Sequence, residues 1–370
     1  HHYLATDIYS EIDLPLFSQS AVDGYALCSH EAILADAQFE LVGEIRAGQD
    51  QNLQLAQGQA LRIFTGAQIP EGTTTVARQE IVKVLGSNQI QIETNLATHA
   101  DIRDVGEELC KGQLLANLGQ HLTVGAIAAL SIAGVTEVEV SCYPRVAVVI
   151  TGDEVAHNLE DFVAGMIFDA NAPLIQAWFA EHQQQVQIFH VADTESAVVQ
   201  LIQQLKHEYD VILTTGGVSV GDYDFVRPVA LAQGFQQIFW KVKQKPGKPM
   251  LFAEFQRSPE ESCYLLGLPG NPAAVFVGMQ VYTSTLLQAL QGQAQLPNWF
   301  TATLTQPIKS DARERFLRMH AHFEQGQLSV KNLSKQQSHM LSNLMQANCL
   351  VRVPDHQVLS EGSVVQGLFI

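Results

Sequence analysis

The sequence is poor in cysteine and in basic residues, and both shortages exclude classes of protein. Its five cysteines are odd in number and contain no Cys-x-x-Cys pair. This usage argues against a disulfide framework or a zinc site and is typical of reduced thiols in the cytoplasm, where we expect the protein. The chain has 21 Lys and Arg against 38 Asp and Glu, a formal net charge of −17. So acidic a chain is not expected to have nucleic acid or an anionic membrane as its main partner.

Long hydrophobic runs and metal-ligand spacings are also missing. The longest apolar stretch, residues 122–135, contains two glycines and is too short to cross a bilayer. The histidines show no HxxxH pattern, no Ser-His-Asp or Cys-His order stands out, and there is no Walker-type phosphate loop. Its 370 residues are 46% hydrophobic and 16% charged. The chain is therefore predicted to form two to four globular domains.

Residues 210–228, DVILTTGGVSVGDYDFVRP, have the pattern of a buried strand, a glycine-rich turn and a helix. The apolar run 211–213 predicts the strand, and the glycines within 216–221 break it. Glycine lets a backbone approach a phosphate closely, so the turn is a candidate anion site, although plain turn chemistry also accounts for it. Asp222 and Asp224 beside the turn would repel an anion unless a metal ion or a proton transfer requires them.

Strands alternate with helices over residues 143–290, which predicts a doubly wound, mostly parallel α/β sheet, with Asn171 as the cap of one helix. Four polar segments directly follow predicted strands: TGDE with Glu154, the segment at Asp193, GGVSVGDYD with Asp224, and LPGNP. Because the carboxyl ends of parallel strands share one edge, we expect these segments to converge on one crevice. Taken singly, Glu154, Asp193 and LPGNP also fit helix capping or surface solvation.

Basic residues gather in WKVKQKPGKP, which holds four of the chain's 21. Alternation along an extended segment would place Lys241, Lys243 and Lys245 on one face. Lysine runs are commonly solvated, but in so acidic a chain this one fits the neutralisation of an anionic ligand. Further along, Arg318 in ARERFLR and Ser338 in KQQSHMLSNL would by themselves indicate edge-strand charge and a polar turn.

Short strands separated by turn residues occupy residues 39–93 and the region after Gly292. They predict two small β domains, the second of them a terminal β domain or small barrel. Between the first β region and the α/β region, residues 121–135 predict a helix that packs closely through its small side chains.

Seven motifs occur in order along the chain: SAVDGYAL, IFTGAQIPEG, ITGDEV, GMIFDAN, TTGGVSVGDYDFV, FWKVKQKPGKP and GLPGNPAAV. As an ordered set they resemble the molybdopterin molybdenumtransferase family, MoeA, which includes the E domains of gephyrin and of the plant Cnx proteins. Each motif is weak alone, but the set is highly specific and covers nearly the whole chain. The chain departs from the family pattern at Ala77, Glu108 and Gln337, and none of these departures removes an acidic or lysine position of the motifs.

The resemblance implies a multidomain fold that combines α/β and β parts. It implies a stalk domain split between residues 1–17 and 105–142, an inserted β domain at 18–104, a molybdopterin-binding doubly wound α/β domain at 143–290 and a C-terminal β-barrel-like domain at 291–370. We expect the N-terminal helix of the family to be missing, so that the stalk is truncated. The family also implies a homodimer whose active-site cleft is shared between subunits.

The resemblance further implies an enzyme of molybdenum cofactor biosynthesis. In the family reaction, adenylated molybdopterin and molybdate are the substrates, molybdenum is inserted into the dithiolene, and AMP is released with the assistance of Mg²⁺. A molybdopterin adenylyltransferase would supply the adenylated substrate. Chemistry at a phosphoanhydride depends on charge placement more than on a nucleophilic side chain, which fits the absence of a catalytic triad.

The resemblance assigns roles to residues within the matching motifs. It implies that Asp23, Asp224, Glu154, Lys241 and Lys245 take part in catalysis, with Asp224 and Glu154 also binding Mg²⁺ and the two lysines holding the anions. The residues that it places around the pterin, its phosphate or molybdate are Thr65, Asp193, Gly216, Gly217, Ser219, Gly221, Ser338 and Arg318, with Arg313 as the alternative to Arg318.

Two other functions remain open from the sequence. The first is a binding protein that holds molybdopterin or a related nucleotide without turnover, which the retained Asp23 disfavours. The second is a nucleotide hydrolase built on a related α/β domain, which the flanking β regions and WKVKQKPGKP disfavour. Release of AMP that depends on molybdate would separate the transferase from both.

Overall fold

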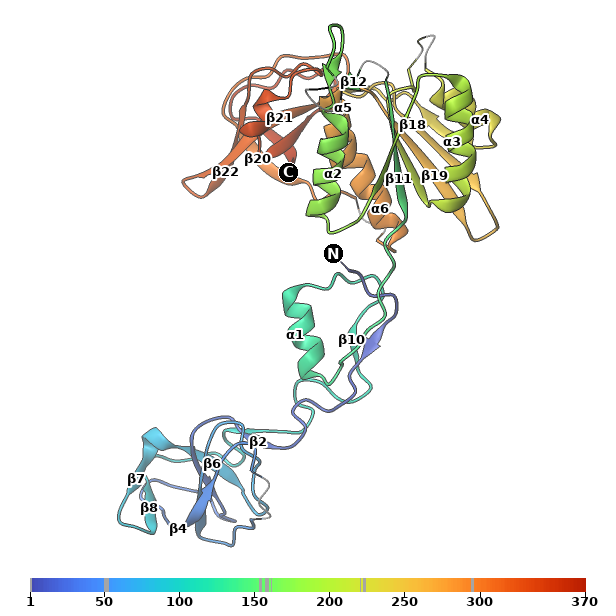
Figure 1. Cartoon of the computed structure of the whole chain (residues 1–370). Helices are drawn as coiled ribbons and strands as arrows, with labels where there is room; N and C mark the ends of the chain where they lie inside the picture. The colour runs from blue at the N-terminus through green and yellow to red at the C-terminus, as the bar shows by residue number, and fades with distance from the viewer. Residues whose placement is uncertain are drawn as a thin grey trace. The chain divides into compact units, whose positions relative to one another are not determined.

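The structure is a computed structural model that describes residues 2–49, 53–152, 155–156, 160, 162–219, 221, 224–293 and 296–370. The chain forms two compact units, residues 2–140 and residues 141–370 (Figure 1). The finer division into four domains, of which the stalk is formed by two separate segments, stays a prediction. Its boundaries follow residues 17, 104, 142 and 290.

The first unit is built on a six-stranded sheet with the order β6-β3-β5-β4-β8-β7. Strand β3 is buried on both faces, because Tyr25 and Leu27 pack into one hydrophobic cluster while Ala26 packs into another. Successive side chains of a strand point to opposite faces, so a strand buried on both faces is apolar throughout. The strands are β3 (Gly24–Leu27), β4 (Gln38–Ile45), β5 (Gln59–Ile63), β6 (Thr75–Arg78), β7 (Val82–Val84) and β8 (Gln89–Ile92), with a 3₁₀ turn η1 (Gln79–Ile81) after β6.

Gly24 begins β3 at a position that has no room for a side chain. A Cβ atom there would lie 2.0 Å from the carbonyl oxygen of Ala77 on the paired strand β6. Gly24→Ala must push the two strands apart, and we expect it to lower the free energy of unfolding by roughly 2–4 kcal/mol, as severe overpacking does. Urea unfolding measures the loss. The matched control is Gly43→Ala on β4, where a Cβ would meet only the Leu61 side chain at 3.8 Å; equal stabilities of the two variants would contradict the close approach.

Over residues 2–49 and 53–140, the rest of the first unit contains two short antiparallel pairs and one α-helix. Strand β1 (Ile8–Tyr9) pairs with β10 (Leu114–Ala116), and β2 (Gln19–Ser20) pairs with β9 (Ile102–Arg103). Segments from the two ends of this unit therefore lie side by side, and the six-stranded sheet is formed by the residues between them.

Helix α1 (Val124–Ile132) is where the sequence predicts a helix, and Thr123 caps it by accepting a hydrogen bond from the Ala126 backbone N–H at 3.1 Å. The prediction that it packs closely through small side chains is wrong. Leu130 is the one buried residue of this fully described helix. Apolar composition indicates that a helix can be buried, but it does not show whether its own unit provides a partner.

The second unit contains a six-stranded mixed sheet with the order β14-β11-β15-β19-β18-β16. The first four strands are parallel, whereas β18 is antiparallel to both β19 and β16. The strands are β11 (Val146–Thr151), β14 (Gln187–Val191), β15 (Val211–Thr215), β16 (Gln236–Trp240), β18 (Leu251–Gln256) and β19 (Ser262–Leu268), and a separate parallel pair is formed by β12 (Val155–Ala156) and β13 (Ile167–Phe168).

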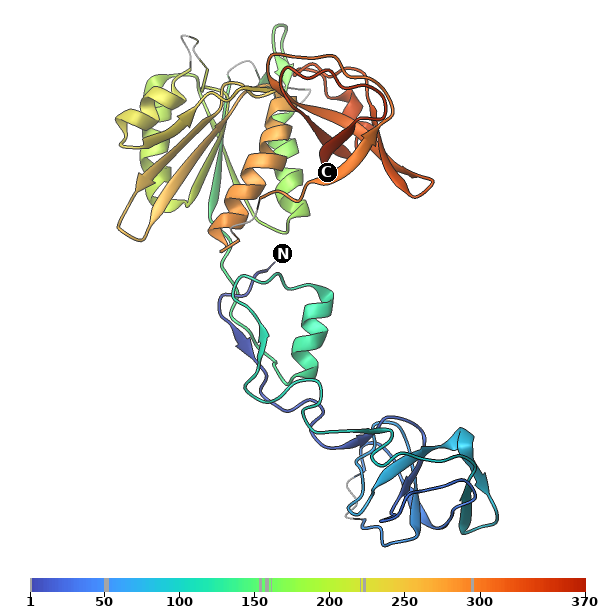
Figure 2. The same cartoon turned by 180° about the vertical axis from the view of Figure 1, so that it is seen from behind.

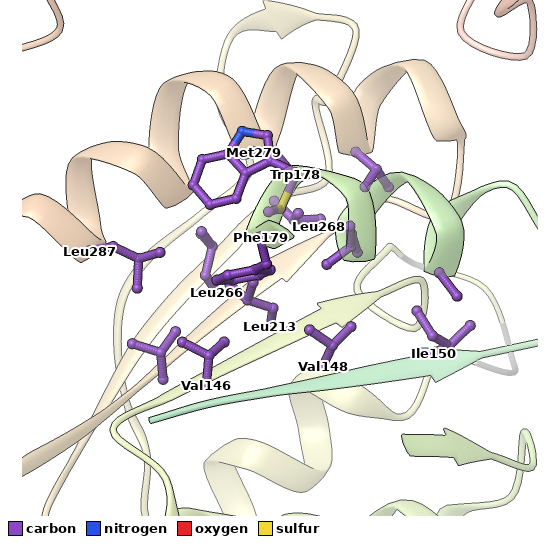
Figure 3. Packing of buried hydrophobic residues seen from close by; sticks show 14 of the residues in the cluster. Val146, Val148, Ile150, Trp178, Phe179, Leu213, Leu266, Leu268, Met279 and Leu287 are labelled. Carbon is purple, nitrogen blue, oxygen red and sulfur yellow. The ribbon is translucent and has the colours of Figure 1, made fainter. Parts of the chain in front are cut away.

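Helices cover both faces of this sheet (Figures 1 and 2). Side chains of β11 alternate between two cores: Val146 and Val148 join the cluster under α2, α5 and α6, and Ala147 and Val149 join the cluster under α3 and α4. Figure 3 shows Phe179 of α2 directed toward the sheet in the first of these cores. The helices are α2 (Asn171–Glu181), α3 (Glu195–Glu208), α4 (Val226–Ala232), α5 (Pro272–Gly278) and α6 (Ser284–Leu290), with a π-helical turn η2 (Met279–Thr283) joining the last two.

The continuous run from α5 to α6, Pro272–Leu290, is the one helix of the described residues that is long and apolar enough to cross a membrane. Half of its most apolar window is buried within the unit. Met279 and Leu287 pack into the core against the sheet, and Val281 packs against Phe316 of the C-terminal strands. The apolar length of this helix is therefore explained by its position between two packed layers.

The C-terminal strands close into a five-stranded barrel in the order β21-β22-β20-β24-β23, with β23 pairing back onto β21. The α/β and β-barrel parts of the predicted fold class are confirmed. Residues of the lysine segment form strand β17 (Gln244–Lys245), which pairs in parallel with β21 and extends this sheet. The barrel strands are β20 (Phe300–Leu304), β21 (Glu314–Glu324), β22 (Gln327–Asn332), β23 (Cys349–Val353) and β24 (Val364–Phe369), and a 3₁₀ turn η3 (Ser342–Met345) precedes β23.

Candidate active site

A cavity of about 710 Å³ lies in the second unit at the edge where the four parallel strands end. The polar segments that follow these strands meet here, because parallel strands present their carboxyl ends at one edge. The structure thus brings together five of the predicted site residues as cavity-lining residues: Asp193, Gly216, Gly217, Gly221 and Asp224. Their roles toward a ligand stay predictions.

The glycine-rich turn after β15 packs tightly against its neighbours. Gly216 has a φ of +91°, and a Cβ atom there would lie 2.6 Å from Thr151 Oγ1. Gly217 has a φ of +67°, and its Cβ would lie 2.5 Å from Val226 Cγ2. Both positions require glycine for backbone conformation and for close approach. The Gly216 N–H donates to the Leu268 carbonyl oxygen at 2.9 Å, which ties the turn to the end of β19.

Three carboxylates among the described residues line the cavity: Asp169, Asp193 and Asp224. Asp224 Oδ2 accepts a hydrogen bond from the Gly221 N–H at 2.6 Å and so fixes the end of the glycine-rich turn. Asp169 Oδ1 accepts from the N–H groups at the start of α2, at 2.8 and 3.1 Å. The N-cap residue of α2 is Ala170, and the Asp169 side chain one residue before it accepts from the first helical N–H groups, so the expectation that Asn171 caps this helix is corrected.

The lining has few groups that could balance an anion. Among the described lining residues there is no lysine or arginine, and His339 is the one side chain that can carry a positive charge. The described part of the chain contains no group of three or more His, Cys, Asp or Glu side chains that could hold a metal ion. Glu154 and Asp222 lie outside the described residues, so the roles predicted for Glu154 stay predictions.

The lysine segment is tied to the barrel and does not line the cavity. Lys245 Nζ is 2.9 Å from Asp311 Oδ2, and Lys243 Nζ is 2.5 Å from Asp355 Oδ2. The hydrogen bond from Lys245 is the main cause that lowers the pKa of the Asp311 carboxyl. Ion pairs with such exposed lysines contribute at most about 1 kcal/mol, so they orient the segment more than they stabilise it. The anion-holding role of Lys245 stays a prediction.

Lys241 follows β16 at the same sheet edge as the cavity, since β16 runs in the direction of β19. Its Nζ lies 3.9 Å from the ring centroid of Trp240. The Trp240 Nε1–H donates to the Val218 carbonyl oxygen at 2.9 Å, within the glycine-rich turn. Trp240 therefore connects Lys241 with this turn, in which the predicted site residue Ser219 is exposed and does not line the cavity.

Arg318 and Ser338 hold the barrel segment that reaches the cavity. Arg318 is 2% exposed, and its guanidinium donates hydrogen bonds to carbonyl oxygens of residues 335, 337 and 340. The Ser338 carbonyl oxygen accepts a hydrogen bond from the Ala273 N–H at the start of α5, at 3.2 Å. Neither Arg318 nor Ser338 lines the cavity, although His339 and Leu341 of the same segment do.

Asp23 and Thr65 belong to the first unit, where they are bonded to each other. Asp23 Oδ1 accepts hydrogen bonds from the Thr65 N–H at 2.8 Å and from its hydroxyl at 2.7 Å. Both bonds lower the pKa of the Asp23 carboxyl, and the bond from the Thr65 backbone N–H has the larger effect. The pair forms because Asp23 precedes β3 and Thr65 follows β5, and these strands are antiparallel neighbours.

Asp169 and His339 line the cavity without having been predicted to do so. Asp169 lies in the motif GMIFDAN, which supports the family resemblance without implying a role for this residue, and His339 lies beside Ser338 on the barrel. A carboxylate just before a predicted helix is a signal for Asp169, although the sequence pattern favours Asn171 as the cap; nothing local to His339 indicates that a barrel segment reaches the α/β domain.

The fold and the cavity define a class of protein: a multidomain protein with a glycine-rich, acid-lined ligand cavity on its α/β domain. Family models match consecutive parts of the chain: residues 1–134 match the MoeA N-terminal region (domain I and II), residues 147–289 the "Probable molybdopterin binding domain", and residues 301–369 the MoeA C-terminal region (domain IV). The chain belongs to the MoeA family of molybdopterin molybdenumtransferases.

Curated relatives and a solved structure agree with this membership. The molybdopterin molybdenumtransferase of Haemophilus influenzae is 33% identical over 356 residues, which cover 94% of this chain and 85% of the relative. The molybdopterin molybdenumtransferase of Staphylococcus epidermidis is 30% identical over 368 residues, covering 95% and 84%. The crystal structure of the molybdopterin biosynthesis moeA protein from Pyrococcus horikoshii matches with a TM-score of 0.83 and 25% identity, over 100% of this chain and 92% of that chain. The predicted function in molybdenum cofactor biosynthesis and the transferase class are confirmed.

Proposed function

We propose that this chain inserts molybdenum into molybdopterin, with adenylated molybdopterin and molybdate as substrates and AMP as a product. The observation that carries the proposal is the cavity of about 710 Å³, which lies in the part of the chain that matches the molybdopterin-binding model. Its volume is that of a small-molecule site, and its glycines let the backbone approach a phosphate. A molybdopterin adenylyltransferase would supply the adenylated substrate.

We propose that Mg²⁺ assists the reaction and that Asp224 and Glu154 hold it. The donor set of the described lining residues fits this ion, because it is rich in carboxylate oxygens and contains no lysine or arginine. Mg²⁺ prefers hard oxygen ligands and is commonly held by one or two carboxylates together with phosphate oxygens. When bound, the ion would offset the negative charge of the phosphoanhydride. Asp224 also holds the Gly221 N–H, so it orients the turn beside the ligand.

The remaining predicted residues take their proposed roles from their motifs. Asp23 is proposed as a catalytic carboxylate that Thr65 holds in its ionised form. Lys241 and Lys245 are proposed to hold anionic groups of the substrates. The residues proposed to surround the pterin and its phosphate are Asp193, Gly216, Gly217, Ser219 and Gly221. Ser338 and Arg318 are proposed to serve the molybdate side, Arg318 through the segment that its guanidinium holds.

The proposed reaction is tested with purified protein, adenylated molybdopterin and Mg²⁺, with and without molybdate. AMP is measured by chromatography over time. Release that requires molybdate supports the proposal. Tight binding of adenylated molybdopterin with no AMP in either sample would contradict it and would favour a binding protein.

We propose that the protein is a cytoplasmic homodimer and that the exposed face of α1 is part of its interface. Val124 and Ile127, three residues apart and so on the same side of this helix, are 88% and 55% exposed. Ile132 at its end is 60% exposed. Large apolar side chains exposed on one side of a helix are typical of an interaction site, and a second copy of the chain offers the same side chains. The free thiols of the structure fit a reducing compartment.

Ile127→Glu places a charge beside Val124 on this face and is expected to weaken dimerisation by at least tenfold, because a buried unpaired charge is costly. Sedimentation velocity over a range of concentrations measures the change. Leu34→Glu, at a residue that is 59% exposed in the β part of the same unit, is the matched control and should leave the dimer intact. Equal dimerisation constants for the two variants would show that α1 is not part of the interface.

A further inference from the structure

The barrel brings one segment, residues 335–341, onto the cavity of the α/β domain. His339 and Leu341 of this segment line the cavity together with Asn271 and Pro272 at the start of α5. The two sides are joined by a hydrogen bond from the Ala273 N–H to the Ser338 carbonyl oxygen at 3.2 Å. This bond places the main chain next to His339 at a defined position relative to the cavity.

The segment is held in the barrel by a buried guanidinium. Arg318 lies on β21 and is 2% exposed. Its guanidinium donates to the Lys335 and Gln337 carbonyl oxygens at 3.0 and 3.2 Å, and also to the Met340 carbonyl oxygen. The planar fork of arginine can reach several acceptors at once, which the point charge of lysine cannot do. Arg318 therefore fixes the main chain on both sides of His339.

Gln336 fixes the same segment by a second route. Its side chain accepts a hydrogen bond from the Arg318 N–H at 3.1 Å and donates one to the Arg318 carbonyl oxygen at 2.7 Å. The Arg318 side chain thus bonds to the main chain of the segment, and the Gln336 side chain bonds to the main chain of β21. These partly buried bonds satisfy the polar groups of Arg318 and Gln336 and together fix the position of the segment on the barrel.

The charge of the cavity shows what the segment can contribute. Its described lining contains the carboxylates of Asp169, Asp193 and Asp224, no lysine or arginine, and His339. An anionic ligand is repelled by the carboxylates, so the histidine is the one described lining side chain able to attract it by charge. The ring can also donate a hydrogen bond when neutral.

We propose that His339 binds the anionic part of the pterin substrate and that Arg318 is the positioning residue that holds His339 at the cavity. The inference rests on the proposed function, because it takes the phosphate-bearing pterin to be the ligand of this cavity. It assigns affinity to His339 and leaves the chemical step to the carboxylates.

His339→Ala and His339→Gln are expected to raise the KM for adenylated molybdopterin about tenfold, with kcat changed less than about twofold, since an interaction of equal strength in ground and transition states changes KM alone. His339→Lys restores a positive charge and should restore KM to within about threefold of the parent value. His322→Ala, on the same barrel beside Glu324, is the control and should change neither constant. A KM for His339→Ala equal to that of the control would overturn the role of His339.

Arg318→Lys keeps the charge but cannot span three carbonyl oxygens, and it should raise KM by about the same factor as His339→Ala. The double variant should be no worse than either single variant, because residues that act through one another are not additive. Multiplied effects, or an unchanged KM for Arg318→Lys, would contradict the positioning role. Should Arg318→Lys fail to fold, Gln336→Ala can replace it, because it loosens the same segment without removing the buried cation. It should raise KM in the same way.

Equilibrium binding of molybdopterin, followed by quenching of its fluorescence on titration with protein, separates this inference from the proposed reaction. A parent protein that binds molybdopterin but releases no AMP disproves the proposed function, and the dissociation constants of the His339 variants then still decide the role of His339. An active parent whose His339→Ala variant binds molybdopterin with unchanged affinity disproves the inference and leaves the proposed function standing.

Discussion

Asp224→Asn is expected to leave the fold intact and to reduce molybdate-dependent AMP release by at least roughly 10²–10³-fold, the size of effect seen when one preorganised charge or donor is lost. The physical reason is charge. The asparagine oxygen can still accept the hydrogen bond that the Gly221 N–H makes with Asp224 at 2.6 Å, so the turn keeps its conformation. The carboxylate charge, which we propose helps to hold Mg²⁺, is lost. AMP release at saturating substrate measures the effect.

The control for Asp224→Asn is Glu208→Gln, which removes a carboxylate at the end of α3 in the same domain, at a position that does not line the cavity. Both variants should unfold at the parent temperature, and only the first should lose activity. Normal turnover by Asp224→Asn would remove Asp224 from the catalytic residues and would leave the hydrogen bond to Gly221 as its function.

Asp23→Asn is expected to reduce kcat/KM for AMP release by at least about 10²-fold at every pH at which the parent enzyme works. Asp23 accepts two hydrogen bonds from Thr65, and they lower the pKa of its carboxyl below the ordinary value of 3.8. It is therefore ionised throughout the neutral range, and the substitution removes a permanent charge. A full pH profile measures the effect, and a loss confined to one end of the profile would contradict it.

Thr65→Val tests how Asp23 is held. The variant keeps the backbone N–H donor and loses the hydroxyl donor, so the pKa of Asp23 should rise toward its ordinary value and activity should fall less than in Asp23→Asn. A carboxyl whose pKa is lowered by folding stabilises the fold above its unfolded pKa, and that stability is lost as the pH falls through the folded pKa. Carbon-13 NMR titration of the carboxyl measures the shift; an unchanged pKa would contradict the contribution of the hydroxyl.

The meeting of the strand-end segments could be predicted from the sequence because it follows from one rule. Buried runs such as Val211–Thr215 identify parallel strands, and parallel strands end at one edge. Asp193 therefore reaches the same cavity as Gly216 and Asp224, although it follows β14 and they follow β15. The glycines carry a further signal, since positions with positive φ and no room for a Cβ are marked by glycine in the sequence.

Contacts between distant elements could not be predicted in the same way. Lys245 pairs with Asp311 because β17 joins the barrel sheet beside β21, and Arg318 of β21 holds the segment that carries His339. No local sequence pattern predicts such contacts between residues that are far apart in the chain. The exposure of α1 is not predictable for a related reason: an apolar helix has the same sequence pattern whether its partner lies in its own unit or elsewhere.

The measurement that tests the central claim most directly is the amount of molybdenum in the isolated pterin product set against the amount of AMP released in the same reaction. Elemental analysis of the purified product gives the first quantity, and chromatography gives the second. The proposed transfer predicts that molybdenum and AMP appear in equimolar amounts and that both disappear without molybdate. AMP released in full without molybdate, or with no molybdenum in the pterin, would show a hydrolase and contradict the transfer.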